Sequence, residues 1–467
     1  MGWSGVLAVA LVAAAVLVVP GLQLASLLRL RGAYWWGLAP GLGVGAVGLL
    51  TLLWGGLGFS WGWPAWFALL GFLAALQILQ WARSRGAPRQ PLSRLATQQS
   101  FLAGLGVLTY LCIRLVVVLP AMGAPDAVPH LGDSAFHMQG ALLVYEGGDV
   151  FPFGALSDLY TPDQESSYYY PTAWHAIVSL LMSFVEVAPA TNAAILAVSA
   201  LLWPAGVAAL GLALRPKSST IAFWAPVLLV PVSMFPGALG IAYSVYPFAL
   251  SMVTLPLTLA AVLMWQRSHE GRYVALFLLG LAGAVAAQPS GVIFPLVAVA
   301  IALLQGFGSR AWQWWKEGRR VPAVLTVLAL VVAVAGVGIV IRTSSYVASL
   351  AAFPRETIYE NPVMAYLDGT VAATSDPWWP WVGVLACAAA GVVILVRQAT
   401  GWTYVLTTVA AVVAFVAAAG PDSALRALTG PWYKDHVRLG GVAAMLTVVL
   451  AAVFGAWAFD RFVGQRV

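Results

Sequence analysis

The sequence GDSAFH at residues 132–137 and the sequence YYYP at residues 168–171 belong to one long polar stretch that begins near residue 121. Apolar runs long enough for membrane helices lie on both sides of this stretch. A long segment rich in Asp, Glu, His and Tyr between such runs is where a membrane protein places binding or chemistry. The search for a functional site therefore starts at residues 121–170.

Composition decides the class of protein. The chain is 61% hydrophobic and 9% charged, with a mean hydropathy of +0.89. Soluble domains carry about 25% charged residues. Cys112 and Cys387 both fall inside apolar runs, so the cysteines indicate no disulfide framework. The sequence therefore predicts an all-α polytopic membrane protein.

Apolar runs of about 17 to 25 residues predict 13 membrane-spanning helices. The run at residues 171–187 is apolar but short, and we expect a helix that dips into the outer leaflet or lies along it. If this run crossed the membrane, Arg215, Lys217, Arg267 and Arg272 would lie on the opposite side from most of the other Lys and Arg residues. The predicted spans are 4–27, 34–57, 64–81, 100–120, 190–214, 219–237, 247–265, 273–288, 290–307, 321–342, 379–396, 402–419 and 437–459.

Charge predicts the orientation. All but six of the 23 Lys and Arg residues fall on one side of this layout, and short cationic loops stay in the cytoplasm. The prediction is a multi-pass protein of the cell membrane with its N-terminus outside and its C-terminus inside. The net charge of +6 then reflects topology, and it indicates no nucleic-acid partner. Trp312, Trp314 and Trp315 lie among basic residues and are predicted to anchor the inner face.

This layout divides the chain into five regions. Three outer segments, residues 121–170, 343–378 and 420–436, hold most of the acidic residues and many aromatics. The five regions are the N-terminal transmembrane helices (1–120), an outer loop and juxtamembrane helix with the predicted active site (121–189), the central transmembrane helices (190–342), an outer loop (343–378), and the C-terminal transmembrane helices with their outer loop at 420–436 (379–467).

Asp133 and His137 are the candidate catalytic residues. They are four residues apart, so on a helix both side chains project from one face towards the same cavity. A carboxylate beside apolar surface can act as a general base that deprotonates an attacking hydroxyl. The alternative is that Asp133 only caps a helix that begins at Ser134.

These features resemble the GT-C superfamily of polytopic glycosyltransferases, which use lipid-phosphate-linked sugars as donors. Asp133 matches the catalytic carboxylate of their first outer loop. Tyr169, Tyr170 and Pro171, followed by Trp174 and His175, are similar to the aromatic-Pro element that opens their next helix. The resemblance implies a GT-C-like fold of the actinobacterial type. It also implies inverting transfer of a sugar from a polyprenyl-phosphate donor to a glycan or lipid acceptor outside the membrane.

The resemblance also implies a site for the donor. The phosphate leaving group gains negative charge in the transition state, and fixed cations stabilise it. We predict Arg438, Lys434, His436 and Arg114 as phosphate ligands; contact with lipid headgroups is the alternative for the Lys and Arg side chains. The predicted substrate-binding residues are Tyr169, Tyr170, Trp174, His175, Trp432 and Tyr433.

Two points stay open at the level of sequence. Many members of the superfamily carry paired acids, whereas Asp133 is followed by Ser134, so no metal ligands are assigned and a divalent metal is left open. A transporter or flippase of a lipid-linked or polar solute is the competing class. Such a protein is expected to place its ionisable residues on broken helices near the membrane midplane. Here they gather at the outer boundary, which favours an enzyme.

Overall fold

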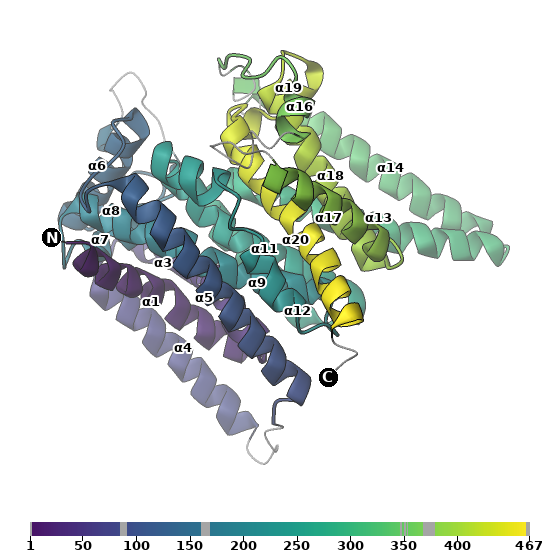
Figure 1. The fold of residues 1–467 in the computed structure, drawn as a ribbon, viewed down its shortest axis with the longest axis horizontal. Coiled ribbons are helices and arrows are strands. Elements are labelled where there is room, and N and C mark those ends of the chain that lie inside the picture. Colours follow the sequence, from purple (N-terminus) through teal and green to yellow (C-terminus); the bar gives the residue numbers. More distant parts are fainter. Residues whose placement is uncertain are drawn as a thin grey trace.

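The structure is a computed structural model that describes residues 2–84, 91–159, 169–345, 348–349, 352, 354–367 and 379–463. Every regular element in this part of the chain is a helix. Long helices run roughly side by side, with α4 on one flank and α14 on the other (Figure 1). The predicted all-α class is therefore confirmed.

The first half of the chain supplies α1 (Trp3–Leu27), α2 (Ala33–Gly37), α3 (Ala39–Gly56), α4 (Trp63–Arg83), α5 (Arg94–Met122), α6 (Gly132–Gly147), η1 (Ser157–Leu159), α7 (Ala173–Leu181), α8 (Val187–Leu196), η3 (Ala197–Leu202), α9 (Trp203–Leu214), α10 (Ile221–Val227) and η4 (Met234–Ala242). The second half supplies α11 (Tyr246–Ser268), α12 (Gly271–Ala287), η5 (Pro289–Val292), α13 (Ile293–Lys316), α14 (Arg320–Thr343), α16 (Pro362–Leu367), α17 (Trp379–Leu395), α18 (Ala399–Ala419), α19 (Ala424–Ala427), η6 (Gly430–Trp432) and α20 (His436–Phe462).

Nine helical stretches in the described residues are long and apolar enough to cross a membrane. Three shorter apolar stretches, in α12, α14 and α17, lie where further spans were predicted. Length and apolar composition together make this a polytopic membrane protein, because only a lipid environment accommodates so much apolar helix surface.

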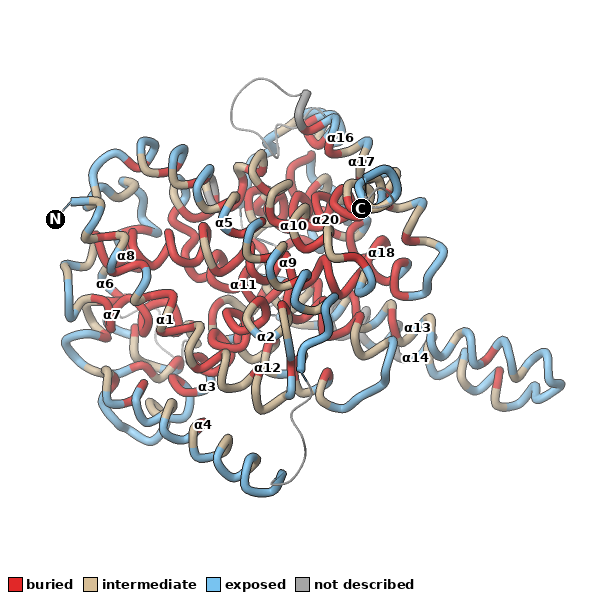
Figure 2. Tube along the Cα trace, turned by 60° about the horizontal axis from the view of Figure 1, so that its bottom comes forward, coloured by how far each residue is buried: buried red, intermediate tan, exposed pale blue. Residues whose placement is uncertain are grey.

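The bundle has a buried centre and an exposed periphery. In the most apolar 18 residues of the stretch Val187–Leu214, 94% of the residues are buried. The same fraction is 89% in α11 and 17% in α4. Figure 2 shows the buried residues gathered in α9, α11 and α20, while α13 and α14 project from the bundle. The centre is therefore where side chains from distant parts of the chain meet.

The predicted span at 219–237 is wrong as a continuous helix. The structure has two short pieces there, α10 and η4, joined by turns. Proline explains the break, because Pro231 and Pro236 lack the backbone N–H that a helix needs. The residue before a proline is pushed towards extended backbone, and Phe235 has φ −127° and ψ 130°.

Helix α7 occupies the predicted short run at 171–187. Its nine residues span about 14 Å, which is too short to cross the hydrocarbon core of about 30 Å. All nine residues are buried, in contact with α6, α8, α1 and α3. The helix does not span, as expected, but protein surrounds it on all sides, so it does not lie along a lipid surface.

Candidate functional site

A cavity of about 290 Å³ lies where four helices begin. The first turns of α6, α11, η5 and α20 contribute Asp133, Pro247, Pro289 and Arg438 to its wall. The N–H groups of a first turn have no partner within the helix, and the helix dipole is positive at this end. The full lining is Asp133, Phe136, His137, Tyr169, Tyr170, Pro171, Val245, Pro247, Gln288, Pro289, Arg355, Tyr433 and Arg438.

Asp133 lies in the first turn of α6 with an exposed side chain. The helix begins at Gly132, and the hydroxyl of Ser134 accepts a hydrogen bond from the Leu131 N–H at 3.3 Å. The same hydroxyl donates to the Pro129 carbonyl. The cap position before Gly132 is Leu131, and Ser134 stabilises this first turn from within the helix, so the interpretation of Asp133 as the cap is wrong. Within the described residues the Asp133 carboxylate has no hydrogen bond or ion pair, so its oxygens are available to a ligand in the cavity.

His137 lines the cavity one turn further along α6. Only 5% of its surface is exposed, and its Nδ1 lies 3.2 Å from Nε2 of the fully buried His175 on α7. A Cβ on Gly140 would lie 2.7 Å from Cδ2 of His175, so only glycine allows α6 to approach this closely. The two imidazoles form a hydrogen-bonded pair behind the wall of the cavity.

Both histidines of this pair are uncharged near neutral pH. Burial lowers the pKa of His175 to about 3. Burial also lowers the pKa of His137, and the nearby His175 and Arg438 lower it further. A neutral imidazole donates through one nitrogen and accepts through the other. His137 therefore has Nε2 left for one contact besides His175.

Arg438 also lines the cavity, from the first turn of α20. Its side chain is 11% exposed, and Nε is 3.4 Å from Oδ2 of Asp435. The guanidinium lies 4.9 Å from the centre of the Tyr433 ring. Its Nη1 is buried and has no hydrogen-bond partner in the part of the chain that the structure describes. A buried donor without a partner costs free energy, so this guanidinium is suited to an anionic ligand in the cavity.

Arg355 provides a second cation in the lining. Its Nη2 lies 3.2 Å from the same Asp435 carboxylate, and its Nε donates to the Tyr433 carbonyl. The buried Arg426 holds this segment from behind by donating to the carbonyls of Arg355 and Glu356, at 3.0 and 2.7 Å. One carboxylate thus orients two guanidiniums, and the pair keeps an excess of positive charge in the cavity that Asp133 also lines.

Three predicted aromatic contacts, Tyr169, Tyr170 and Tyr433, do lie in the lining. The Tyr169 hydroxyl donates to the Val285 carbonyl at 2.9 Å, which ties the segment before α7 to the end of α12. Sequence reasoning missed Arg355 and Gln288 as site residues. Signals for both were present. Arg355 is a cation of the predicted outer segment 343–378, and Gln288 lies at the break between two predicted spans.

Three predicted substrate contacts lie outside the lining. Trp174 is 1% exposed and stacks on Tyr246, with ring centres 5.0 Å apart. Trp432 is 4% exposed and packs against Phe294. His175 lies behind three lining residues: it contacts His137 through a ring nitrogen, and Phe136 and Tyr170 through its ring. These side chains support the wall from the protein interior.

Three predicted phosphate ligands also lie outside the lining. Arg114 donates to the Val230 carbonyl at 3.1 Å, within the broken segment between α10 and η4. The carbonyls freed by that break need a donor in an apolar environment, which explains the position of this cation. His436 packs edge-on against Tyr359, and Lys434 is half-buried beside the cavity.

The donor set of the cavity does not fit a divalent metal. Mg²⁺ and Ca²⁺ prefer several oxygen ligands, whereas Asp133 is the one carboxylate among the described residues of the lining. The described residues contain no group of three or more His, Cys, Asp or Glu side chains close enough to share an ion. The described residues of the lining therefore assign no ligands to a divalent metal.

Fold and cavity together define a class: a helical membrane protein with a polar, cation-lined cavity where several helices begin. A family model matches residues 14–467, so the chain belongs to that family, which is described as a family of unknown function, DUF6541. No curated protein and no solved structure matches the chain.

Proposed function

We propose that this protein is a GT-C-like membrane glycosyltransferase. It transfers a sugar from a polyprenyl-phosphate donor to a glycan or lipid acceptor of the cell envelope, on the outer face of the membrane. The observation that supports this most is that Asp133 and Arg438, from α6 and α20, line the same cavity. A base and a phosphate ligand in one cavity are what the transfer needs.

The reaction follows from the positions of these groups. An acceptor hydroxyl attacks the anomeric carbon of the donor while the Asp133 carboxylate takes its proton. The bond between the anomeric carbon and the phosphate oxygen breaks, and polyprenyl phosphate leaves with the electron pair. Attack from the opposite side inverts the anomeric configuration. Arg438 and Arg355 stabilise the charge that develops on the phosphate.

His137 positions the substrate in this proposal. Its Nδ1 is engaged by His175, so Nε2 is available for a hydrogen bond to a sugar hydroxyl. Because both imidazoles are uncharged, the wall on this side adds no positive charge near Asp133. The aromatic rings of Phe136 and Tyr170 beside His137 provide the flat apolar surface on which a sugar ring packs.

The proposed orientation places the cavity outside the cell. In this orientation the N-terminus is outside the cell membrane and the C-terminus is in the cytoplasm. The reason is that all but six of the Lys and Arg residues fall in segments on the side away from the cavity. Reporter fusions at residue 150 and at the C-terminus should report opposite sides of the membrane. Both reporters on one side would contradict the layout.

A transporter or flippase is the second candidate, and one observation favours it. Arg114 lies within α5 beside the broken segment between α10 and η4. An ionisable residue at a broken helix is typical of secondary transporters. The hydrogen bond from Arg114 to Val230 gives this cation a structural role, so the enzyme is the stronger proposal.

The test is sugar transfer by the purified protein in liposomes. Polyprenyl-phosphate donors that carry arabinose or mannose are supplied with a membrane extract as acceptor, and label in the acceptor is measured. Transfer that Asp133→Asn abolishes supports the enzyme and names the sugar. Movement of the labelled lipid across the bilayer without transfer, retained in Asp133→Asn and lost in Arg114→Gln, would support the second candidate.

A further inference from the structure

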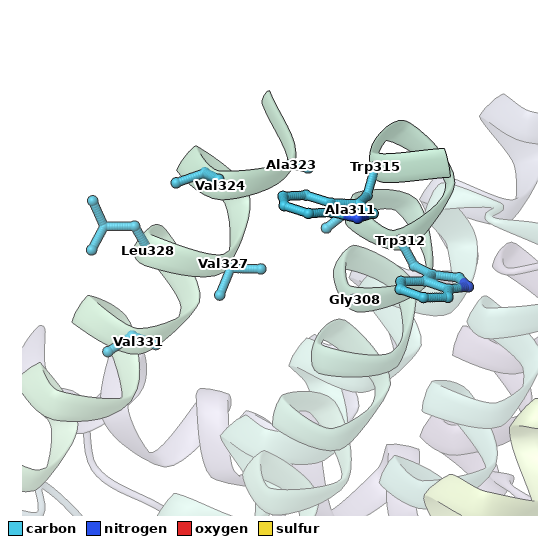
Figure 3. Close-up of a pocket in the computed structure, with 9 residues that line it drawn as sticks. All are labelled: Gly308, Ala311, Trp312, Trp315, Ala323, Val324, Val327, Leu328 and Val331. Atoms are coloured by element: carbon cyan, nitrogen blue, oxygen red, sulfur yellow. The ribbon is translucent and has the colours of Figure 1, made fainter. Parts of the chain in front are cut away.

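Helices α13 and α14 form a hairpin that projects from the bundle (Figure 2). Between them lies an apolar groove of about 500 Å³. Trp312 and Trp315 line it from α13, and Val327, Leu328 and Val331 line it from α14 (Figure 3). The α14 side chains are more than half exposed, so no described part of the chain covers the groove.

The turn of this hairpin carries three cations and one exposed carboxylate, that of Glu317, so its net charge is positive. Lys316, Arg319 and Arg320 are exposed, and within the described residues none of them forms an ion pair with a carboxylate. Two of these cations lie over the indoles that line the groove. Lys316 Nζ is 5.1 Å from the Trp312 ring, and the Arg320 guanidinium is 5.7 Å from the Trp315 ring. A net positive charge therefore lies at one end of the apolar groove.

This end of the hairpin is far from the cavity that contains Asp133. Pro289, just before α13, lines that cavity, and the 24 residues of α13 extend about 36 Å away from it. The basic turn thus lies near the opposite membrane surface from the cavity. At such a surface a lipid presents a polar headgroup next to its acyl chains. The hairpin presents cations next to an apolar groove, so the headgroup would meet the cations and an acyl chain the groove.

We propose that the groove binds one anionic phospholipid of the inner leaflet. An acyl chain packs along Val327, Leu328 and Val331, and the phosphate contacts Arg319, Arg320 and Lys316. An anionic headgroup matches the unpaired cations, whereas a zwitterionic headgroup would bring its own ammonium group against them. Basic pockets between transmembrane helices on the cytoplasmic side are suited to anionic headgroups for this reason.

Native mass spectrometry of the delipidated protein in detergent tests the proposal. Phosphatidylglycerol and phosphatidylcholine with identical acyl chains are added separately, and the occupancy of bound lipid is measured. We expect one phosphatidylglycerol to bind at least roughly tenfold more tightly than phosphatidylcholine, because each nearby cation contributes on the order of a few-fold in affinity. Equal affinity for the two lipids would overturn the proposal.

Two variants locate the site. Arg319→Gln with Arg320→Gln should remove most of the preference for phosphatidylglycerol. The matched control is Arg83→Gln with Arg94→Gln, which removes equal charge from exposed positions in α4 and α5 and should keep it. Equal loss in the two double variants would show that only net charge matters and would overturn the proposal.

Gly308→Leu tests the groove itself. Gly308 lines the groove, and a Cβ added there would meet no atom within 4 Å, so a larger side chain has space to enter the groove. It should weaken phosphatidylglycerol binding while the protein stays folded. Unchanged lipid binding together with loss of a dimer mass would show that the groove holds a second copy instead, which would contradict the proposal.

Discussion

The cavity beside α6 and the groove of the α13–α14 hairpin both bring cations next to aromatic rings, yet they hold them differently. In the cavity Arg438 is 11% exposed, and its position is set by Asp435 and Tyr433. At the groove Arg319 and Arg320 are exposed and are not paired with a carboxylate in the described residues. The first arrangement is rigid and the second is adaptable.

This difference separates chemistry from attachment. Stabilising a transition state requires donors that are already in place, because reorganising them during the reaction costs free energy. Holding a lipid headgroup requires only charge near the membrane surface, which flexible side chains supply. Substitutions should therefore damage activity at the cavity and leave both activity and folding nearly intact at the hairpin.

The largest effect is expected for Asp133→Asn. The amide keeps the shape of the side chain but cannot accept the proton, so transfer should fall by about 10²- to 10⁴-fold. Because the Asp133 side chain is exposed, the melting temperature should not change. Asp126→Asn, at an exposed position in the same outer segment, is the control and should transfer sugar normally. Normal transfer by a folded Asp133→Asn protein would remove the base from the mechanism.

Arg438→Ala should have the next largest effect. Loss of the buried guanidinium should weaken transition-state stabilisation by about 2–4 kcal/mol, measured as kcat/KM for the donor. Arg438→Lys should recover only part of this, because an ammonium group lacks the planar fork that binds two phosphate oxygens. Lys434→Ala is the comparison, since Lys434 lies outside the lining. Equal losses at Lys434 and Arg438 would mean that the phosphate lies elsewhere.

The buried histidine pair should make stability depend on pH. Burial lowers the pKa of His175 from 6.5 to about 3, so between these values the unfolded chain binds more protons than the folded protein. Stability is therefore complete above pH 6.5 and falls as the pH decreases, with a slope of up to about 1.4 kcal/mol per pH unit for each histidine.

The melting temperature between pH 7.5 and 5 measures this effect. His175→Asn removes one titrating group and should flatten the profile. A profile that is equally steep in His175→Asn would assign the pH dependence to other groups.

The smallest effect is expected at the hairpin. Arg319→Gln with Arg320→Gln should change the free energy of unfolding by no more than about 0.5 kcal/mol in detergent, because both side chains are exposed. Sugar transfer in liposomes of phosphatidylcholine should also be unchanged. A loss of transfer comparable with that of Arg438→Ala would contradict the proposal that the cavity carries the chemistry and the hairpin only binds lipid.

Much of the fold can be predicted from the sequence, because the signals that predict it are local. Apolar runs of sufficient length locate α1, α5, α11 and α20, since a helix satisfies its own backbone hydrogen bonds within the run. The four-residue spacing of Asp133 and His137 places both on one face of α6, and both line the cavity. Pro231 and Pro236 also carried a local signal for the break after α10, which hydropathy alone outweighed.

Which residues line the cavity was decided by the tertiary structure. Sequence reasoning chose Arg114 as a phosphate ligand and passed over Arg355. In the structure α5 turns Arg114 towards Val230, whereas Arg426 and Asp435 hold Arg355 at the cavity. Trp174 and His175 likewise follow the YYYP stretch, yet α7 is buried on all sides and turns them inward. Hydropathy and helical period are set by neighbouring residues, whereas contacts between distant helix ends arise only when the whole bundle packs.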